Sequence, residues 1–509
     1  MKFIIALAVA AGLHASQTTA SIGGQVLNSA DDEPLNGVVL VLTAAASAST
    51  PLKFVTETRG LFLFENLPPG RYVLFAESAG FARQVFGSHG NPLAGITLSL
   101  AAGQEMNDLQ FDLIPGSTIS GKILDAGGNA IPGATVLALQ PIYRRGSKEY
   151  VPLGSATSDD NGEYRLANLG PGSYLLSAAS RGGEGIATFY PNSPEIANAA
   201  AIRVGAGAAA TGTNIRLVKA VTYRVAGKLD AEKAAADIAW LTRKGAGATA
   251  LVTRLAAPID SDGSFAFPYV PPGTYVLTAT ERDGVAPAST PLNVSVTAKN
   301  VEGIVLKPQS SGELPGTISL GVAGNSLPRG MQVVLESADT LMPRPPRAAV
   351  ADDGKFTLKN LPAGRYIAHV QMPENLYVRS VRYRTLDVTE NGFEFGGGVP
   401  ALLLISLSAN GAVVEGRVRG ADGVPMPGAV VALTPSLRRY SRYKETTTDQ
   451  NGAYTFAGVP PGEYKIYSWE QIETGAYQNA EWLKQFELKG RAVVAKQDGH
   501  ETVTLRAIQ

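Results

Sequence analysis

The chain has 509 residues, 45% of them hydrophobic, which is enough for three to five domains of the usual ~100 to 200 residues, each with its own core. Its 44 basic and 44 acidic residues cancel, so its bulk charge attracts neither nucleic acid nor an anionic membrane. Because it has no cysteine, disulfides, thiolate nucleophiles, iron–sulfur centres and cysteine-ligated zinc are all excluded.

Residues 1–20 have the pattern of a secretory signal peptide. Lys2 precedes an apolar run over residues 3–13, and small residues follow at Ala15 and Ala20. This run is shorter than the ~20 residues that span a membrane. We therefore predict cleavage between Ala15 and Ala20, with a retained membrane anchor as the alternative. The mature chain should be exported, to the periplasm, the outer surface or the medium, without stable membrane insertion.

One 13-residue string recurs five times, at residues 58–70, 160–172, 261–273, 352–364 and 450–462. The leading glycines of successive copies are 102, 101, 91 and 98 residues apart. This period is that of a domain, whereas solenoid repeats have periods of ~20 to 50 residues. The recurrence predicts five repeats, of which the third and fourth are degenerate, over residues 21–115, 116–219, 220–309, 310–409 and 410–509.

Each copy of the string has the pattern of a turn, a strand, a corner and a second strand. Asp-x-Gly or Asp-Asn-Gly favours a turn in which the glycine has positive φ. Alternating residues such as 163–166 then predict a half-buried strand. Pro-Pro-Gly or Pro-Ala-Gly forms the corner, to which the following tyrosine can donate a hydrogen bond. With no long helical period, these patterns predict an all-β tandem array of five Greek-key antiparallel β-sandwiches.

A short glycine-containing strand and a proline–glycine corner precede the string in most copies, for example residues 119–123 and 131–139. The combined motif G-x-V, P-[LIM]-x-G-[AV]-x-V and D-x-x-G-x-[FY]-x-[FL]-x-x-[LV]-P-P-G-x-Y resembles the carboxypeptidase regulatory-like domain, of transthyretin-like fold. The resemblance covers residues 21–509, although the third and fourth copies depart from the motif upstream of the string. It implies a binding or structural module.

The sequence predicts no catalytic or metal site and no cofactor. None of the three histidines outside the signal peptide is followed three residues later by glutamate, which a zinc carboxypeptidase requires. Nucleophile-elbow and phosphate-loop motifs are missing from the sequence. Acidic turns such as residues 158–162 lack the alternating oxygen ligands of a calcium loop. We therefore expect a protein that is not an enzyme.

The last repeat concentrates aromatic residues between positions 440 and 486, and seven of them belong neither to the string nor to the tyrosine position that follows it. Asn479 is predicted to cap a short helix that carries Trp482 and Phe486 on one face. This helix either closes the end of the terminal sandwich or belongs to an exposed platform that stacks on sugar rings. The candidate ligand-binding residues of such a platform are Tyr440, Tyr443, Trp469, Tyr477, Trp482, Arg438 and Arg439.

Two loops at matching positions of the second and fifth repeats, residues 140–150 and 434–445, each combine Arg-Arg with several tyrosines. They predict either recognition surfaces or solvated edge hairpins protected by positive charge. The function that we expect is carbohydrate or cell-envelope polymer binding by an exported protein. The alternative is a structural spacer, or an accessory subunit that contacts an envelope protein.

Overall fold

The computed structural model describes residues 19–44, 50–88, 95–180, 186–230, 236–244, 254–280, 288–308, 311–321, 326–337, 345–396 and 401–509. The predicted signal peptide lies outside them, apart from its last two residues. Regular structure within these ranges is almost entirely β, which confirms the predicted fold class. The described exceptions are short: α2 (Ala480–Lys484), η1 (Thr58–Gly60), η2 (Ile196–Asn198), η4 (Tyr440–Arg442) and η5 (Ala476–Gln478).

The described strands form ten sheets, and five large hydrophobic clusters lie between them, each enclosed by two sheets. In the first repeat one sheet holds β1 (Ala20–Asn28), β4 (Leu61–Leu67) and β8 (Glu105–Leu113), and the other β2 (Val39–Ala44), β3 (Leu52–Val55), β5 (Gly70–Glu77), β6 (Gln84–Val85) and β7 (Leu98–Leu100). In the second, β9 (Ser117–Leu124), β12 (Glu163–Leu169), β16 (Ala209–Ala210) and β17 (Ile215–Arg216) face β10 (Thr135–Arg144), β11 (Ser147–Thr157), β13 (Gly172–Ala179), β14 (Thr188–Phe189) and β15 (Ile202–Val204).

The remaining repeats have the same two-layer arrangement. The third pairs β18 (Tyr223–Leu229), β21 (Ser264–Val270) and β24 (Val301–Leu306) with β19 (Ile238–Arg243), β20 (Leu255–Pro258), β22 (Gly273–Thr280) and β23 (Leu292–Val296). The fourth pairs β25 (Ser311–Leu320), β28 (Lys355–Pro362), β30 (Tyr377–Tyr383), β31 (Leu386–Asp387) and β33 (Leu403–Ser408) with β26 (Gln332–Ser337), β27 (Arg347–Ala349), β29 (Gly364–Gln371) and β32 (Phe393–Phe395). The fifth pairs β34 (Ala412–Arg419), β37 (Ala453–Val459), β40 (His500–Thr502) and β41 (Leu505–Arg506) with β35 (Val430–Pro435), β36 (Lys444–Thr447), β38 (Gly462–Trp469) and β39 (Arg491–Ala495).

Most strand pairs are antiparallel, as predicted, but the first strand of each repeat also pairs in parallel with a closing strand. The glycine in the middle of the first strand permits this close approach. A Cβ atom on Gly24 would lie 1.9 Å from the carbonyl oxygen of Leu109, and one on Gly416 would lie 1.9 Å from that of Val503. The recurrent glycine is therefore required by packing against the closing strand.

The repeated string has the local structure that its sequence predicts. Its leading glycines all have positive φ, between 68° and 81°. In the second repeat, Asp159 Oδ1 accepts the backbone N–H groups of Asn161 and Glu163 at 2.9 and 2.8 Å. The tyrosine hydroxyl donates to the corner in all five copies: Tyr72 to Pro68 O, Tyr174 to Gly170 O, Tyr275 to Pro271 O, Tyr366 to Pro362 O and Tyr464 to Pro460 O, at 2.6 to 2.9 Å.

A buried hydroxyl side chain just before the string is a further recurrent feature, and sequence reasoning missed it. Ser158 Oγ donates to Ile131 O at 2.7 Å and accepts the Ala134 N–H at 2.9 Å, so it ties the proline–glycine corner to the string. Thr56 and Thr448 bridge the equivalent backbone groups in the first and fifth repeats. In each of these three repeats a serine or threonine lies two positions before the string, and this recurrence could have predicted the bridge from the sequence.

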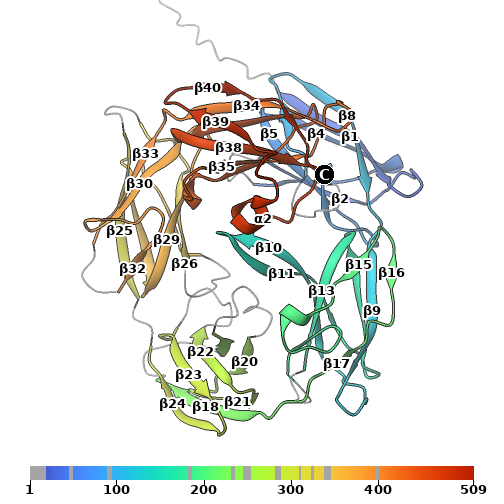
Figure 1. Ribbon diagram of the computed structural model, residues 1–509, viewed down its shortest axis with the longest axis vertical. Coiled ribbons are helices and arrows are strands. Elements are labelled where there is room, and N and C mark those ends of the chain that lie inside the picture. The colour runs from blue at the N-terminus through green and yellow to red at the C-terminus, as the bar shows by residue number, and fades with distance from the viewer. Residues whose placement is uncertain are drawn as a thin grey trace, which may run out of the picture.

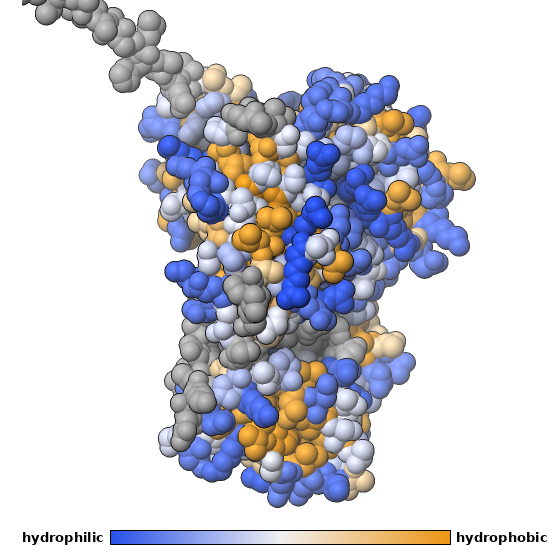
Figure 2. Space-filling view, turned by 90° about the vertical axis from the view of Figure 1, so that its left-hand side faces the viewer, coloured by the Kyte–Doolittle hydropathy of each residue, from blue (hydrophilic) through white to orange (hydrophobic). Residues whose placement is uncertain are grey.

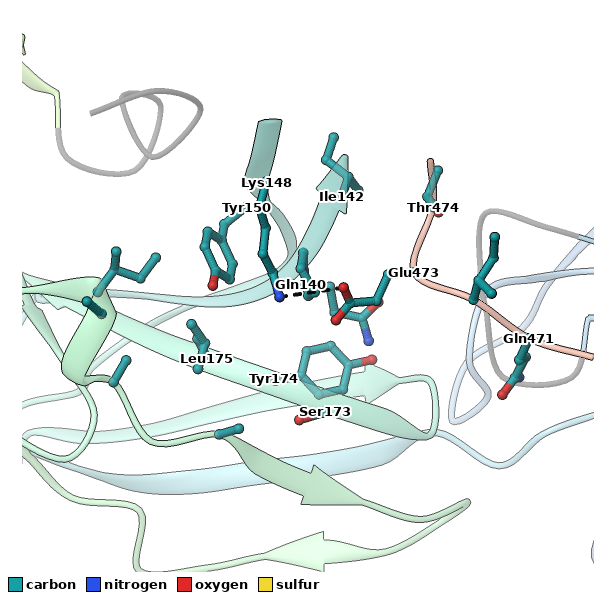
Figure 3. Close-up of a pocket in the computed structure, with 16 residues that line it drawn as sticks. Gln140, Ile142, Lys148, Tyr150, Ser173, Tyr174, Leu175, Gln471, Glu473 and Thr474 are labelled. Carbon is teal, nitrogen blue, oxygen red and sulfur yellow. Dashed lines mark ion pairs between the residues drawn. The ribbon is translucent and has the colours of Figure 1, made fainter. Parts of the chain in front are cut away.

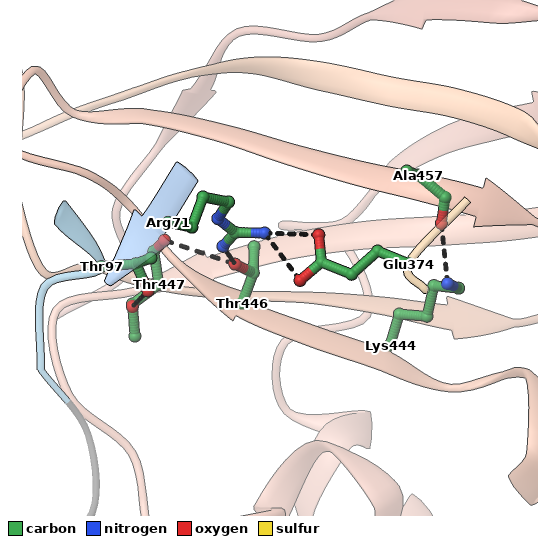
Figure 4. A network of polar contacts seen from close by, with 7 residues as sticks. All are labelled: Arg71, Thr97, Glu374, Lys444, Thr446, Thr447 and Ala457. Carbon is green, nitrogen blue, oxygen red and sulfur yellow. Dashed lines mark hydrogen bonds and ion pairs between the residues drawn. The ribbon is translucent and has the colours of Figure 1, made fainter. Parts of the chain in front are cut away.

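The chain curves back on itself, so that the fifth repeat, red in Figure 1, lies against the first, in blue. Arg71 of the first repeat donates to both carboxylate oxygens of Glu374 in the fourth, at 2.8 and 3.1 Å, and to Thr446 Oγ1 in the fifth, at 3.1 Å (Figure 4). Thr447 Oγ1 donates to Gly95 O at 2.6 Å. Figure 2 shows the side at the left of Figure 1, where hydrophobic residues gather in patches surrounded by hydrophilic ones. These contacts join the first repeat to the fourth and fifth, so the repeats form a closed arrangement, which we call the frame. The sequence predicts only a tandem array.

Candidate functional site

The extra aromatic residues of the fifth repeat pack around Trp469 in a second, smaller hydrophobic cluster. The predicted cap is present, since Asn479 Oδ1 accepts the Trp482 N–H at 2.9 Å and starts α2. The ring centroids of Trp482 and Phe486 lie 5.6 and 5.7 Å from that of Trp469. Tyr467 stacks on Trp469 at 5.4 Å. Trp482 of α2 and Phe486, two residues beyond the end of this helix, therefore cover the Trp469 ring.

The seven candidate residues differ in exposure. Trp469 and Tyr477 are only 1% and 5% exposed, so neither ring offers a face to a ligand in this structure. Burial raises the pKa of Tyr477 far above its usual range and keeps the hydroxyl protonated. Of the two interpretations of this cluster, the packing favours a closing element over an exposed platform. Tyr440, Tyr443 and Trp482 are half-buried, while Arg438 and Arg439 are exposed.

The two Arg–Tyr loops, far apart in the sequence, meet at this cluster. The hairpin of β10 and β11 turns at Arg145 and Gly146 and lies beside α2 in Figure 1. Tyr143 N–H donates to Thr474 O at 2.7 Å, and Asn479 Nδ2 donates to Gly146 O at 2.8 Å. The tip of this hairpin is therefore an internal contact with the fifth repeat, which corrects the expectation of a recognition surface or a solvated edge there.

Arg145 joins three repeats at this junction. Its guanidinium donates to Glu390 O of the fourth repeat at 2.5 Å and lies 5.2 Å from the ring centroid of Tyr440. Tyr440 in turn stacks on Tyr443 at 5.8 Å. Arg145 has a φ of 48°, a left-handed conformation that disfavours side chains other than asparagine or aspartate. An unfavourable backbone at such a contact indicates that the side-chain interactions hold the turn in place.

Two histidines of the described chain are paired with glutamates. His369 Nε2 lies 2.9 Å from Glu336, and His500 Nε2 lies 2.9 Å from Glu415. The hydrogen bond from His369 lowers the pKa of Glu336, against the opposing effect of burial. No group of three or more histidine, aspartate or glutamate side chains that could hold a metal ion is found within the described residues. No helix in those residues is long and apolar enough to span a membrane.

The fold defines a protein built from repeated two-sheet β-domains. A sequence profile of the carboxypeptidase regulatory-like domain matches residues 21–112, 118–218 and 413–472. These three segments are therefore carboxypeptidase regulatory-like domains in a multi-repeat chain. They are also the three repeats that carry the buried hydroxyl bridge. No curated protein matches the chain in sequence.

Several solved structures match the chain at low sequence identity. The Bacillus anthracis TIE protein is 12% identical, with 76% of this chain and 73% of that chain covered and a TM-score of 0.17. A streptococcal ancillary pilin is 10% identical, with 57% and 99% covered and a TM-score of 0.18. The minor pilin of Streptococcus agalactiae is 14% identical, with 40% and 97% covered and a TM-score of 0.24. At these scores the similarities carry no functional argument.

Proposed function

We propose that this chain is an exported, non-catalytic protein that binds a carbohydrate or another polymer of the cell envelope. The observation that carries the proposal is the loop between β35 and β36, which exposes Arg438 and Arg439. Tyr440, stacked between Arg145 and Tyr443, anchors this loop. Donors on a preorganised loop lose little conformational entropy on binding. Arginine is also enriched at sites that dominate binding energy.

The test is binding of the mature protein to a glycan array and to insoluble envelope polysaccharides. The double variant Arg438→Ala/Arg439→Ala should bind at least about tenfold more weakly, because two charged donors that contribute ~1.5 to 3 kcal/mol each are removed. Its melting temperature should not change, since both side chains are exposed. Arg329→Ala is the matched control, because its side chain is 90% exposed in another repeat. An unchanged affinity in the double variant would exclude this loop as the binding surface.

The alternative is a structural or accessory subunit of a cell-surface complex. It is favoured by the burial of Trp469 and Tyr477, whose rings are covered by other residues of the chain and do not face solvent. The contacts that join the fifth repeat to the first, second and fourth give a compact frame. Failure of the mature chain to bind any glycan or envelope polymer would make this alternative the preferred function.

A further inference from the structure

A cavity of about 550 Å³ lies between the second and fifth repeats, and residues of both repeats line it (Figure 3). It arises because β10 separates from β13 while it stays paired with β11. The pairing of β10 with β13 ends at Leu139, where the register with β11 also shifts. Pro141 follows and has no N–H to continue the ladder. Residues 172–174 of β13 pair with β15 instead, and residues 471–474 of the fifth repeat cover the gap.

The lining of this cavity is amphipathic. One side is formed by alanine and aliphatic side chains, among them Leu175, Ile196 and Ile472. The other side carries Lys148 and Glu473, whose charged atoms lie 3.5 Å apart. Gln140 and Tyr150 complete the polar side, and within the described chain their side chains form no hydrogen bond. The Gln140 amide and the Tyr150 hydroxyl can therefore hydrogen-bond to a ligand in the cavity.

We propose that this cavity binds a neutral oligosaccharide, and the proposal rests on the function proposed above. Its one cation and one anion already neutralise each other, so an anionic ligand would meet Glu473 and a cationic ligand would meet Lys148. A neutral sugar can hydrogen-bond to both groups without separating them. Sugars are amphipathic, with C–H faces that suit the apolar wall and the Tyr150 ring. The volume lies within the ~300 to 1,000 Å³ typical of small-molecule sites, which often form between domains.

A ligand in this cavity would contact both repeats, because the second repeat forms the floor and residues 471–474 form the cover. Binding to the closed arrangement but not to a separated one stabilises the closed arrangement by linkage. Saturating ligand should therefore raise the melting temperature of the full chain. This gives a readout that is independent of the affinity measurement.

The experiment is calorimetric titration of the full mature chain with soluble malto-, cello-, xylo- and chito-oligosaccharides, and with an oligogalacturonate as the charged probe. Gln140→Leu and Tyr150→Leu each remove a polar group while keeping apolar volume. Each should weaken binding of the neutral ligand about tenfold or more, the effect of losing one good hydrogen bond or stacking contact. Tyr269→Leu is the control, because Tyr269 is 45% exposed in the third repeat. Thermal melting of each variant verifies that it is folded.

The possible results separate this site from the proposed function. Binding that is lost in both cavity variants and kept in Tyr269→Leu supports the cavity. Wild-type binding that is unchanged in both cavity variants overturns the cavity assignment and leaves the proposed function standing. Retention on an insoluble polymer without binding of any soluble oligosaccharide also overturns the cavity assignment and leaves the proposed function standing. Equal affinity for the oligogalacturonate overturns the neutral ligand class, and failure to bind any polymer or oligosaccharide overturns both proposals.

Discussion

Two buried serine hydroxyls illustrate how strongly the context of a single polar group affects stability. Ser158 Oγ makes two hydrogen bonds to the backbone, whereas Ser468 Oγ is buried without a partner in the described chain. A buried hydroxyl that is unpaired loses its hydration without compensation. A paired one satisfies backbone groups that would otherwise be buried and unbonded.

Ser158→Ala should therefore destabilise the second repeat by ~1 to 3 kcal/mol, whereas Ser468→Ala should be neutral or slightly stabilising for the fifth. Because a chain of several domains need not unfold in one step, the measurement is hydrogen exchange resolved by peptide, which reports the local stability of each repeat. Equal effects of the two substitutions would contradict this account.

Among the strands, the first strand of each repeat is the most constrained, because it pairs on one side with the strand of the string and on the other with a closing strand. Gly416→Ala should destabilise the fifth repeat by ~3 kcal/mol or more, since its Cβ would lie 1.9 Å from Val503 O and the closing strand must move. Gly205→Ala is the control, because no atom lies within 4 Å of its added Cβ. Hydrogen exchange over residues 500–506 measures the effect, and unchanged protection there would be inconsistent with this packing.

For the whole molecule, we expect the hairpin of the second repeat to help keep the frame closed, because its tip contacts both the fourth and the fifth repeats. Arg145→Asn retains a residue that tolerates positive φ but removes the contacts to Glu390 and Tyr440. Small-angle X-ray scattering should then show a larger maximum dimension than for the wild type. Arg384→Asn is the matched control, because Arg384 also has positive φ, 57°, and is exposed. An equal dimension for Arg145→Asn and the wild type would mean that other contacts close the frame. We propose repeat boundaries near residues 115, 219, 309 and 409, where limited proteolysis should cut first.

The features that could be read from the residues alone are those contained within short segments. The turn glycines, the alternating strands, the tyrosine corners and the Asn479 cap each depend on backbone preferences and neighbours within a few residues, so the sequence is sufficient to predict them. The role of the first-strand glycine could not be read this way, because the carbonyl that excludes a Cβ at Gly416 belongs to Val503. The sequence also could not show whether the aromatic cluster of the fifth repeat is exposed or buried, because the same rings suit a binding platform or a core. Burial of Trp469 and Tyr477 follows from how rings within the fifth repeat pack in three dimensions. The cavity beside them follows from contacts between the second and fifth repeats, hundreds of residues apart. Neither leaves a periodic signal in the sequence.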